Sequence, residues 1–170
     1  VPLDEAFVQS VLDEAPDHAF AWILAVTTYR GHGRFDDADG IGRAALDAGQ
    51  GSAWLLSELA VNALQRGRHA EAIDYGVQSL RLEPGSWPPR LHAAMGAAHL
   101  GDVETFERLA AMPGAPTLAS LLLGRVQQRV RRRSEAVASF EVALARARSD
   151  GDRRLECRVL RELATLDVDT

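Results

Sequence analysis

SAWLLSELAVNALQRGRHAEAIDYGVQSLRLEP, residues Ser52–Pro84, is the stretch that decides the fold. It predicts one helix, a turn that contains Gly67, a second helix and a stop at the final proline. The same arrangement occurs before it and after it at a constant offset, which equals the separation of Gly33 from Gly67. A fixed period of about 34 residues with two helices per period is typical of a helical repeat array.

Small residues recur at equivalent positions of this repeat. Gly33, Gly67 and Gly101 share the turn position, where glycine tolerates the left-handed backbone that ends a helix. Three further sets of equivalent positions hold Ala38 and Ala72; Ala45 and Ser79; and Val26, Ala60 and Ala94. Small side chains allow two helices to approach to about 8–10 Å between their axes, so we expect closely packed helical hairpins.

These positions resemble those of the tetratricopeptide repeat (TPR) family. The matching residues of the first two units are Trp22, Ala25, Val26, Tyr29, Gly33, Ala38 and Ala45, then Leu59, Ala60, Gly67, Ala72, Ser79 and Pro84. The third unit departs from the pattern, because Phe106 takes an alanine position and Met112-Pro113-Gly114 cuts its second helix short. The later matches are Leu123, Gly124, Ala136, Phe140 and Ala143, then Leu160, Leu163 and Ala164. The resemblance implies an all-α, right-handed superhelix of about four hairpins plus a helix at each end.

We expect one TPR-like array over residues 1–170. Its units are 1–16 (partial), 19–52, 53–86, 87–116 (shortened), 117–150 and 151–170 (partial). In this register the chain begins with a second helix, ends with a first helix and lacks an initial methionine. We therefore expect a fragment of a longer protein, with self-association through uncapped ends as a further expectation.

Side chains that cap helices mark three of the expected helix starts. Asp17, Ser52 and Asp102 each precede a helical pattern, and each has an oxygen that accepts a hydrogen bond from a free N–H of the first turn. Proline and glycine at 113–116 predict a rigid turn. We find no strand candidate, since no segment alternates between apolar and polar residues.

Composition excludes several classes of function. An apolar fraction of 46% supports a packed core, while a net charge of −5 does not favour nucleic acid as a partner. No apolar run reaches the roughly 20 residues that a membrane helix needs, and no signal peptide is visible, so we expect a cytoplasmic protein. All 19 basic residues are arginine, which excludes lysine-dependent phosphate loops and Schiff bases and suggests a GC-rich bacterial source.

No catalytic residue, cofactor or metal site is predicted. His92 and His99 share a helical face with Met95, but a metal site needs three or four ligands. Cys157 is the only cysteine, and we expect it to be a buried, inert thiol. The acidic run Asp36–Asp39 is interpreted as a solvated first helical turn, where negative charge is favourable.

The first helix of each hairpin in such a solenoid lines the concave face, which we expect to form a peptide-binding groove. Its most informative residues are Phe20, Ile23, Trp54, Val61, Leu91, Met95, Leu121, Arg125, Arg129, Arg158 and Arg161. The apolar members suit an amphipathic helix or an extended peptide. The alternative is a register error of one residue, or a groove covered by neighbouring repeats or another domain.

The arginines favour an acidic segment on the ligand. Residues 120–161 carry 11 arginines and 5 acidic residues, and guanidinium groups suit carboxylates and phosphates. The alternative is a solvated surface on which these arginines pair with Glu135, Glu141 and Glu156. The chain does not resemble the chaperone-binding members of the family. The positions that form their carboxylate clamp are occupied here by Ile23, Thr27, Glu58, Pro88 and His92.

The function predicted from sequence is a protein- or peptide-binding scaffold without enzymatic activity. The alternative is an intramolecular sensor or regulatory domain of a larger bacterial signalling ATPase, transcription activator or protease. The turn Ser149–Asp152, followed by Arg153 and Arg154, resembles the turns of arrays attached to such proteins.

Overall fold

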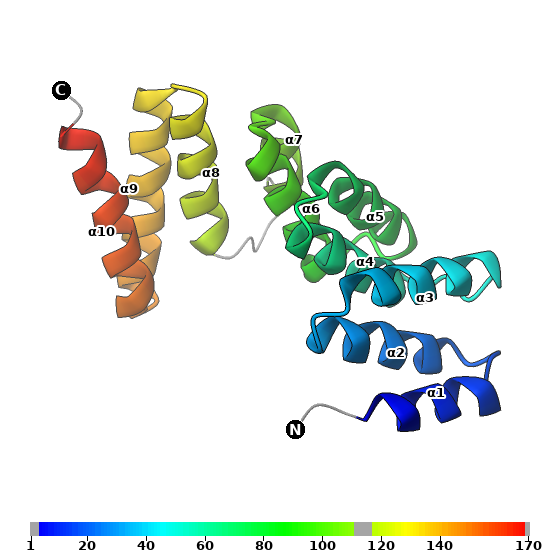
Figure 1. Cartoon of the computed structure of the whole chain (residues 1–170). Helices are drawn as coiled ribbons and strands as arrows, with labels where there is room; N and C mark the ends of the chain where they lie inside the picture. Colours follow the sequence, from blue (N-terminus) through cyan, green and yellow to red (C-terminus); the bar gives the residue numbers. More distant parts are fainter. Residues whose placement is uncertain (1–3, 111–116, 169–170) are drawn as a thin grey trace. The chain divides into compact units, whose positions relative to one another are not determined.

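The computed structural model describes residues 4–110 and 117–168, and all regular structure in these ranges is helical (Figure 1). The helices are α1 (Glu5–Glu14), α2 (Ala19–Gly31), α3 (Phe35–Asp47), α4 (Ala53–Gln65), α5 (His69–Leu82), α6 (Trp87–Leu100), α7 (Val103–Ala110), α8 (Thr117–Arg129), α9 (Arg133–Ser149) and α10 (Arg153–Val168). This order gives four consecutive helix pairs with one helix before and one after them, as predicted. The expected turn at 113–116 lies outside the described residues.

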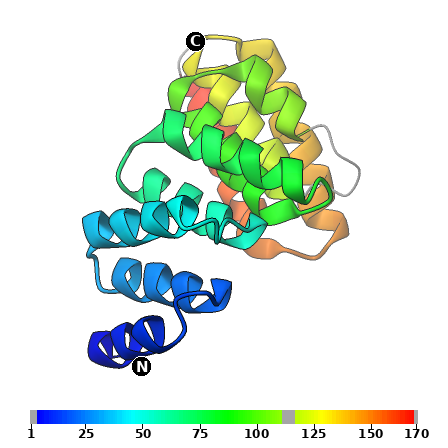
Figure 2. The ribbon, with the colours of Figure 1, turned by 90° about the vertical axis from the view of Figure 1, so that its right-hand side faces the viewer.

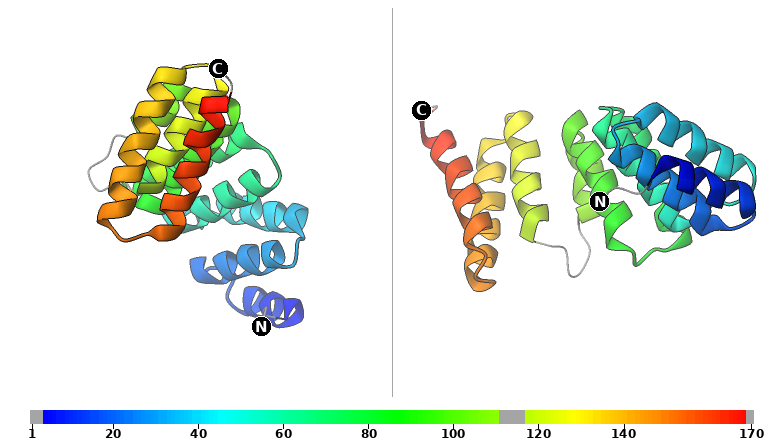
Figure 3. Two further views of the ribbon diagram at one scale, coloured as in Figure 1. Left: turned by 90° about the vertical axis from the view of Figure 1, so that its left-hand side faces the viewer. Right: turned by 60° about the horizontal axis from the view of Figure 1, so that its bottom comes forward.

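The chain forms two compact units, Val1–Gly96 and Ala97–Thr170. Unit 1 contains α1 to α5 and most of α6, and unit 2 contains the last turn of α6 and helices α7 to α10. Within unit 1, α1, α2 and α3 lie side by side (Figure 2). Within unit 2, α9 packs between α8 and α10 (Figure 3).

The small residues lie where the helices approach most closely. Ala38, Ala45, Ala60 and Ala72 are all fully buried. Gly76 shows the limit of this approach, because a Cβ atom there would lie 2.7 Å from the Cβ of Ala93. Close helix packing is therefore the reason for small residues at these positions, as the repeat predicts.

In each unit one apolar cluster spans three successive helices. In unit 1 one apolar cluster joins α2, α3 and α4 through Ile23, Val26, Tyr29, Ala38, Ala45, Leu55 and Leu59. In unit 2 another joins α8, α9 and α10 through Leu121, Ala136, Phe140, Ala143, Ala147, Leu155, Val159 and Leu166. Each helix thus buries one face against its neighbours and leaves the other for solvent or a partner.

Turn chemistry sets the spacing between the helices. Gly33, Gly67 and Gly101 have φ values of 77°, 71° and 74°, which confirms the left-handed turn predicted for them. Arg131 occupies the corresponding turn after α8 with φ of 63° and is the one non-glycine residue with positive φ in the described ranges. A side chain in this conformation costs about 1–2 kcal/mol per residue, so the turn after α8 is strained.

Two of the three predicted caps are confirmed. The Ser52 hydroxyl accepts the N–H of Leu55 at 3.1 Å, and the Asp102 carboxylate accepts the N–H of Thr105 at 3.0 Å. Hydrogen bonds from Thr105 also lower the pKa of Asp102. α2 begins at Ala19, the predicted start, but the prediction that Asp17 caps it is wrong, because His18, whose side chain makes no capping bond, holds the N-cap position.

The acidic first turn of α3 is only partly solvated, which corrects the interpretation made from sequence. Asp39 is 8% exposed, and Arg68 donates to its carboxylate at 2.9 Å. The same hydrogen bond raises the pKa of Arg68. Asp39 belongs to α3 and Arg68 is the N-cap of α5, so this pair links two successive repeats.

None of the helices in residues 4–110 and 117–168 is both long and apolar enough to cross a membrane.

Candidate functional site

Two exposed aromatic residues occupy the same position of consecutive repeats in unit 1. Phe20 and Trp54 are each the second residue of a first helix, α2 or α4, so they lie one repeat apart. Their ring centroids are 6.0 Å apart in an edge-to-face arrangement with an interplanar angle of 61°. Although they contact one another, they remain 49% and 54% exposed. We call Phe20 and Trp54 the aromatic pair.

A polar network beneath the aromatic pair fixes the orientation of the tryptophan. The Trp54 indole N–H donates to one carboxylate oxygen of Glu58, one helical turn further along α4, at 3.2 Å. Arg30 of α2 donates to the other oxygen. The side chains of Arg30 and Glu58 are 20% and 17% exposed, so the ion pair is partly shielded from water. Trp54 is therefore held in place while its ring stays accessible.

A pocket of about 400 Å³ opens beside Trp54 between α4 and α6. We call it the α4–α6 pocket. Its polar lining comes from Ser57 and Glu58 of α4, from Glu83 and Ser86 of the segment between α5 and α6, and from His92 of α6. All of these residues belong to unit 1. The pocket combines an exposed aromatic wall with two carboxylates.

His92 is uncharged at neutral pH. Its Nδ1 lies 3.2 Å from the Ser57 hydroxyl, and burial lowers the pKa of the imidazole below its ordinary value of 6.5. Glu58 and Arg30 act on this pKa in opposite directions. The imidazole therefore offers a hydrogen-bonding group to the α4–α6 pocket without adding positive charge.

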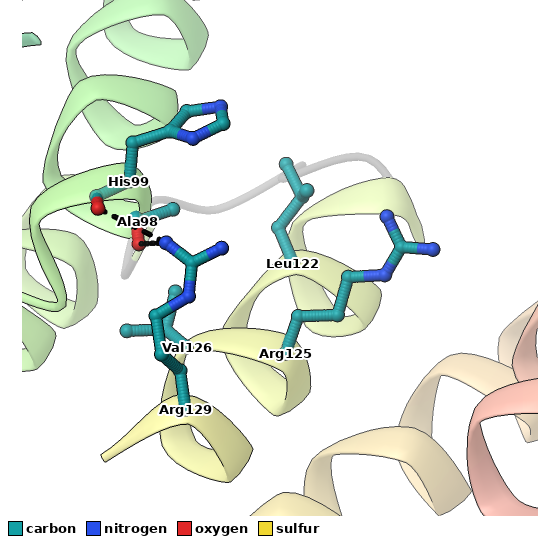
Figure 4. Close-up of a pocket in the computed structure, with 6 residues that line it drawn as sticks. All are labelled: Ala98, His99, Leu122, Arg125, Val126 and Arg129. Carbon is teal, nitrogen blue, oxygen red and sulfur yellow. Dashed lines mark hydrogen bonds between the residues drawn. The ribbon is translucent and has the colours of Figure 1, made fainter. Parts of the chain in front are cut away.

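Unit 2 has a smaller pocket of about 110 Å³, which we call the α8 pocket. Ala98 and His99 at the end of α6 face Leu122, Arg125, Val126 and Arg129 of α8 across it (Figure 4). Leu122 and Val126 give it an apolar wall. The two guanidinium groups point in different directions (Figure 4).

Both arginines of the α8 pocket already have partners. Arg125 donates to the Glu162 carboxylate of α10, with 2.8 Å from Nε. Arg129 donates to the backbone carbonyls of Ala98 and His99, at 3.3 Å and 3.0 Å. Because the last carbonyls of a helix carry partial negative charge, Arg129 stabilises the end of α6. Each guanidinium still has further N–H groups for a ligand.

Two residues predicted to line the groove belong to the core instead. Ile23 is 5% exposed and Leu121 is fully buried, so the prediction that they contact a ligand is wrong. Successive residues of a helix are about 100° apart, and Leu122, one residue after Leu121, faces the α8 pocket. The prediction for α8 therefore fails at Leu121, whereas the predicted Arg125 and Arg129 line the α8 pocket.

The other predicted groove residues are divided between the two units. Val61, Leu91 and Met95 are partly buried in unit 1. Arg158 and Arg161 are exposed on α10 and do not line the α8 pocket. The structure thus brings Arg125 and Arg129 to one pocket but leaves the α10 arginines outside it.

Cys157 also differs from its prediction. The thiol is exposed, because α10 packs into the core through Leu155, Val159 and Leu166. Cys157 lies outside this buried face. Within the described ranges, no group of three or more His, Cys, Asp or Glu side chains is arranged to hold a metal ion.

Some arginines do pair with acidic residues as the solvated-surface alternative proposed. Arg132 contacts Glu135 at 3.3 Å, and Arg148 contacts Glu156 at 2.7 Å. Sequence reasoning missed Glu83 and the Arg30–Glu58 pair. The repeat contains a signal for the latter, because the two residues lie on the first helices of successive hairpins, nearly one repeat apart.

Comparisons with known proteins support the fold. The chain is similar to the crystal structure of MamA, at 18% identity over 88% of this chain and 84% of that chain, with a TM-score of 0.74. It is also similar to YrrB, described as a TPR protein with an unusual peptide-binding site, at 18% identity over 92% and 81%, with a TM-score of 0.72. A third similar structure is TTC0263, a thermophilic TPR protein in Thermus thermophilus, at 19% identity over 94% and 89%, with a TM-score of 0.67. No protein-family model and no curated protein matches the sequence.

Proposed function

We propose that this chain, which has the tetratricopeptide repeat fold, is a protein- or peptide-binding scaffold whose ligand docks on the aromatic pair of unit 1. The single observation that carries the proposal is the exposure of Phe20 and Trp54, at 49% and 54%, side by side on successive repeats. Aromatic side chains held rigid and half exposed are typical anchors of protein interfaces. The described binding of a peptide by YrrB supports a ligand of this kind.

Val61 of α4 and Leu91 and Met95 of α6 are partly buried, and we include them in the proposed surface. We propose that apolar anchors of the ligand contact the aromatic pair and these side chains. When a ligand covers the exposed half of Trp54, its binding free energy becomes more favourable in proportion to the apolar area removed from water. No catalytic role is part of the proposal.

In unit 2, we propose that the α8 pocket receives an acidic group of the ligand. Arg125 and Arg129 retain N–H donors that their present partners do not use. Leu122 and Val126 provide an apolar wall beside them, so an acidic residue next to an apolar one suits this pocket. Arg158 and Arg161 carry further positive charge on α10.

The three similar structures give no support to the alternative of an intramolecular regulator. The prediction of one continuous array over residues 1–170 stays a prediction, as does self-association through its ends.

The test is a selection from a library of displayed random peptides, followed by measurement of the affinity of one enriched peptide. We expect Trp54→Ala to weaken binding about 30-fold or more, since an anchor tryptophan contributes at least about 2 kcal/mol. Phe20→Ala should also weaken it. Phe7→Ala is the matched control, because Phe7 is 53% exposed but lies on α1 and is not part of the aromatic pair.

Binding that needs Trp54 and Phe20 but tolerates Phe7→Ala supports the proposal. If no peptide is enriched, or if all three variants bind the selected peptide as tightly as the unchanged chain, the proposal fails. Arg125→Gln tests the second surface, since it should weaken only those peptides that carry an acidic residue.

A further inference from the structure

The α4–α6 pocket has an unbalanced charge. Two carboxylates, Glu58 and Glu83, line it, and none of its lining residues is an arginine. Arg30 neutralises Glu58 through their ion pair, so the unbalanced negative charge is that of Glu83. His92 contributes no charge at neutral pH because burial lowers its pKa. Residues 1–96 carry 13 acidic residues and 7 arginines, so the unit as a whole adds to the negative potential at the pocket.

Resting on the function proposed above, we propose that the α4–α6 pocket binds a positively charged side chain of the ligand, an arginine or a lysine, between the Trp54 ring and the Glu83 carboxylate. This requirement differs from the acidic group proposed for unit 2, and it concerns a different pocket.

Glu83 carries the unpaired negative charge of the α4–α6 pocket. It is exposed, it occupies the C-cap of α5, and its carboxylate accepts no hydrogen bond among the described contacts. A negative charge at the C-terminal end of a helix opposes the helix dipole and destabilises the helix. A carboxylate in this position adds to the negative end of α5 and attracts a cation to the mouth of the pocket.

Trp54 provides the second contact. A cation over an indole face is attracted by the negative charge of the ring face, and tryptophan is the most effective of the aromatic side chains. The hydrogen bond from the indole N–H to Glu58 holds the ring in position at the pocket. Because Glu58 also accepts from Arg30, it keeps the positive charge of Arg30 paired.

His92 and Ser57 provide polar groups further inside. With Nδ1 directed to the Ser57 hydroxyl at 3.2 Å, Nε2 is the ring nitrogen that remains for a ligand. The groups that face this imidazole are Ser57, Glu58 and Arg30. A neutral ring does not repel a cation, whereas a protonated ring would.

The experiment uses small probes that mimic one residue of a peptide. N-acetyl-arginine methylamide is titrated into the isotope-labelled chain and compared with N-acetyl-citrulline methylamide, which has nearly the same shape and no charge. A second pair compares the lysine and norleucine derivatives, and distinguishes guanidinium from ammonium. The readouts are the NMR signals of the Trp54 indole N–H and of the Glu83 and His92 amides.

We expect a charged probe to bind at least about fivefold more tightly than its neutral counterpart, a ratio that corresponds to about 1 kcal/mol for one exposed charge pair. Glu83→Gln should reduce this ratio about fivefold. Glu14→Gln, which removes the same charge from the exposed side of α1, should leave it unchanged.

Equal binding of the charged and neutral probes overturns the proposal, as does stronger binding of N-acetyl-aspartate methylamide or equal effects of Glu83→Gln and Glu14→Gln. The outcomes also separate this proposal from the general function. Selected peptides that depend on Trp54 but contain no basic residue would refute the cation proposal and leave the scaffold proposal intact. A charged probe that binds the pocket when no peptide can be selected would refute the scaffold proposal and leave the cation proposal intact.

Discussion

Leu121 and Leu122 are consecutive leucines of α8, but only the first belongs to the core of unit 2. Leu121 is fully buried in the core of unit 2, in the cluster that includes Phe140. Leu122 is partly buried and lines the α8 pocket. Substituting each by alanine therefore tests the register of α8 directly, because the two changes remove identical atoms from different surroundings.

The structure predicts a large difference between the two variants. Leu→Ala removes three carbon atoms, and at about 0.8 kcal/mol per buried methylene this costs about 2.4 kcal/mol at Leu121. The cavity left behind brings the loss to about 3–4 kcal/mol. At Leu122 the side chain already borders the open pocket, so we expect a loss of about 1 kcal/mol.

Urea denaturation followed by far-UV circular dichroism measures this difference. Fluorescence is unsuitable, because Trp22, Trp54 and Trp87 all lie in unit 1 while both leucines lie in unit 2. If Leu121→Ala costs less than about 1 kcal/mol, or no more than Leu122→Ala, then Leu121 is not in the core and the described register of α8 is wrong.

Arg131→Gly should stabilise the chain by about 0.5–1 kcal/mol, because it relieves a positive φ of 63° at a smaller cost in chain entropy; a lowered urea midpoint would refute this. Gly76→Ala should destabilise it by about 1–3 kcal/mol, since the new Cβ would lie 2.7 Å from that of Ala93. Gly40→Ala, with no atom within 4 Å, should instead stabilise α3 by about 0.5–1 kcal/mol, and equal denaturation midpoints for the two glycine variants would contradict the described packing. Burial lowers the pKa of His92 in the folded chain, so the unfolded chain binds a proton at this imidazole more readily than the folded chain does. The contribution of the neutral ring to stability is therefore complete above about pH 6.5, and it is lost as the pH falls through the pKa of His92 in the folded chain. Between about pH 7.5 and about pH 5.5 the free energy of unfolding should therefore fall more for the unchanged chain than for His92→Gln. Equal falls would refute the lowered pKa of His92.

The helices and turns were predictable because their causes are local. A glycine that recurs at the turn position of each repeat needs no tertiary information to predict a left-handed turn, and Ser52 and Asp102 cap helices through bonds to residues three positions away. The cap predicted for Asp17 is wrong because the hydrophobic pattern does not show which of two adjacent residues, Asp17 or His18, takes the N-cap position.

The sites were less predictable because they depend on the rotation of each helix. A repeat period places Phe20 and Trp54 at equivalent positions, and both are exposed as predicted. It does not distinguish Leu121 from Leu122, since both fit an apolar stripe and about 100° of rotation separates core from pocket. The pairing of Arg125 with Glu162 depends on the contact between α8 and α10 and on side-chain direction, which the linear sequence does not contain.

The two pockets differ in the charged side chains that line them, and under our proposals this sets a condition on the ligand. In unit 1, Glu83 and a neutral His92 favour a cation beside Trp54. In unit 2, Arg125 and Arg129 favour an anion beside Leu122. A peptide with charges of one sign would be attracted by one pocket and repelled by the other. We therefore expect a ligand that uses both proposed pockets to carry a basic residue for the α4–α6 pocket and an acidic residue for the α8 pocket, beside its apolar anchors.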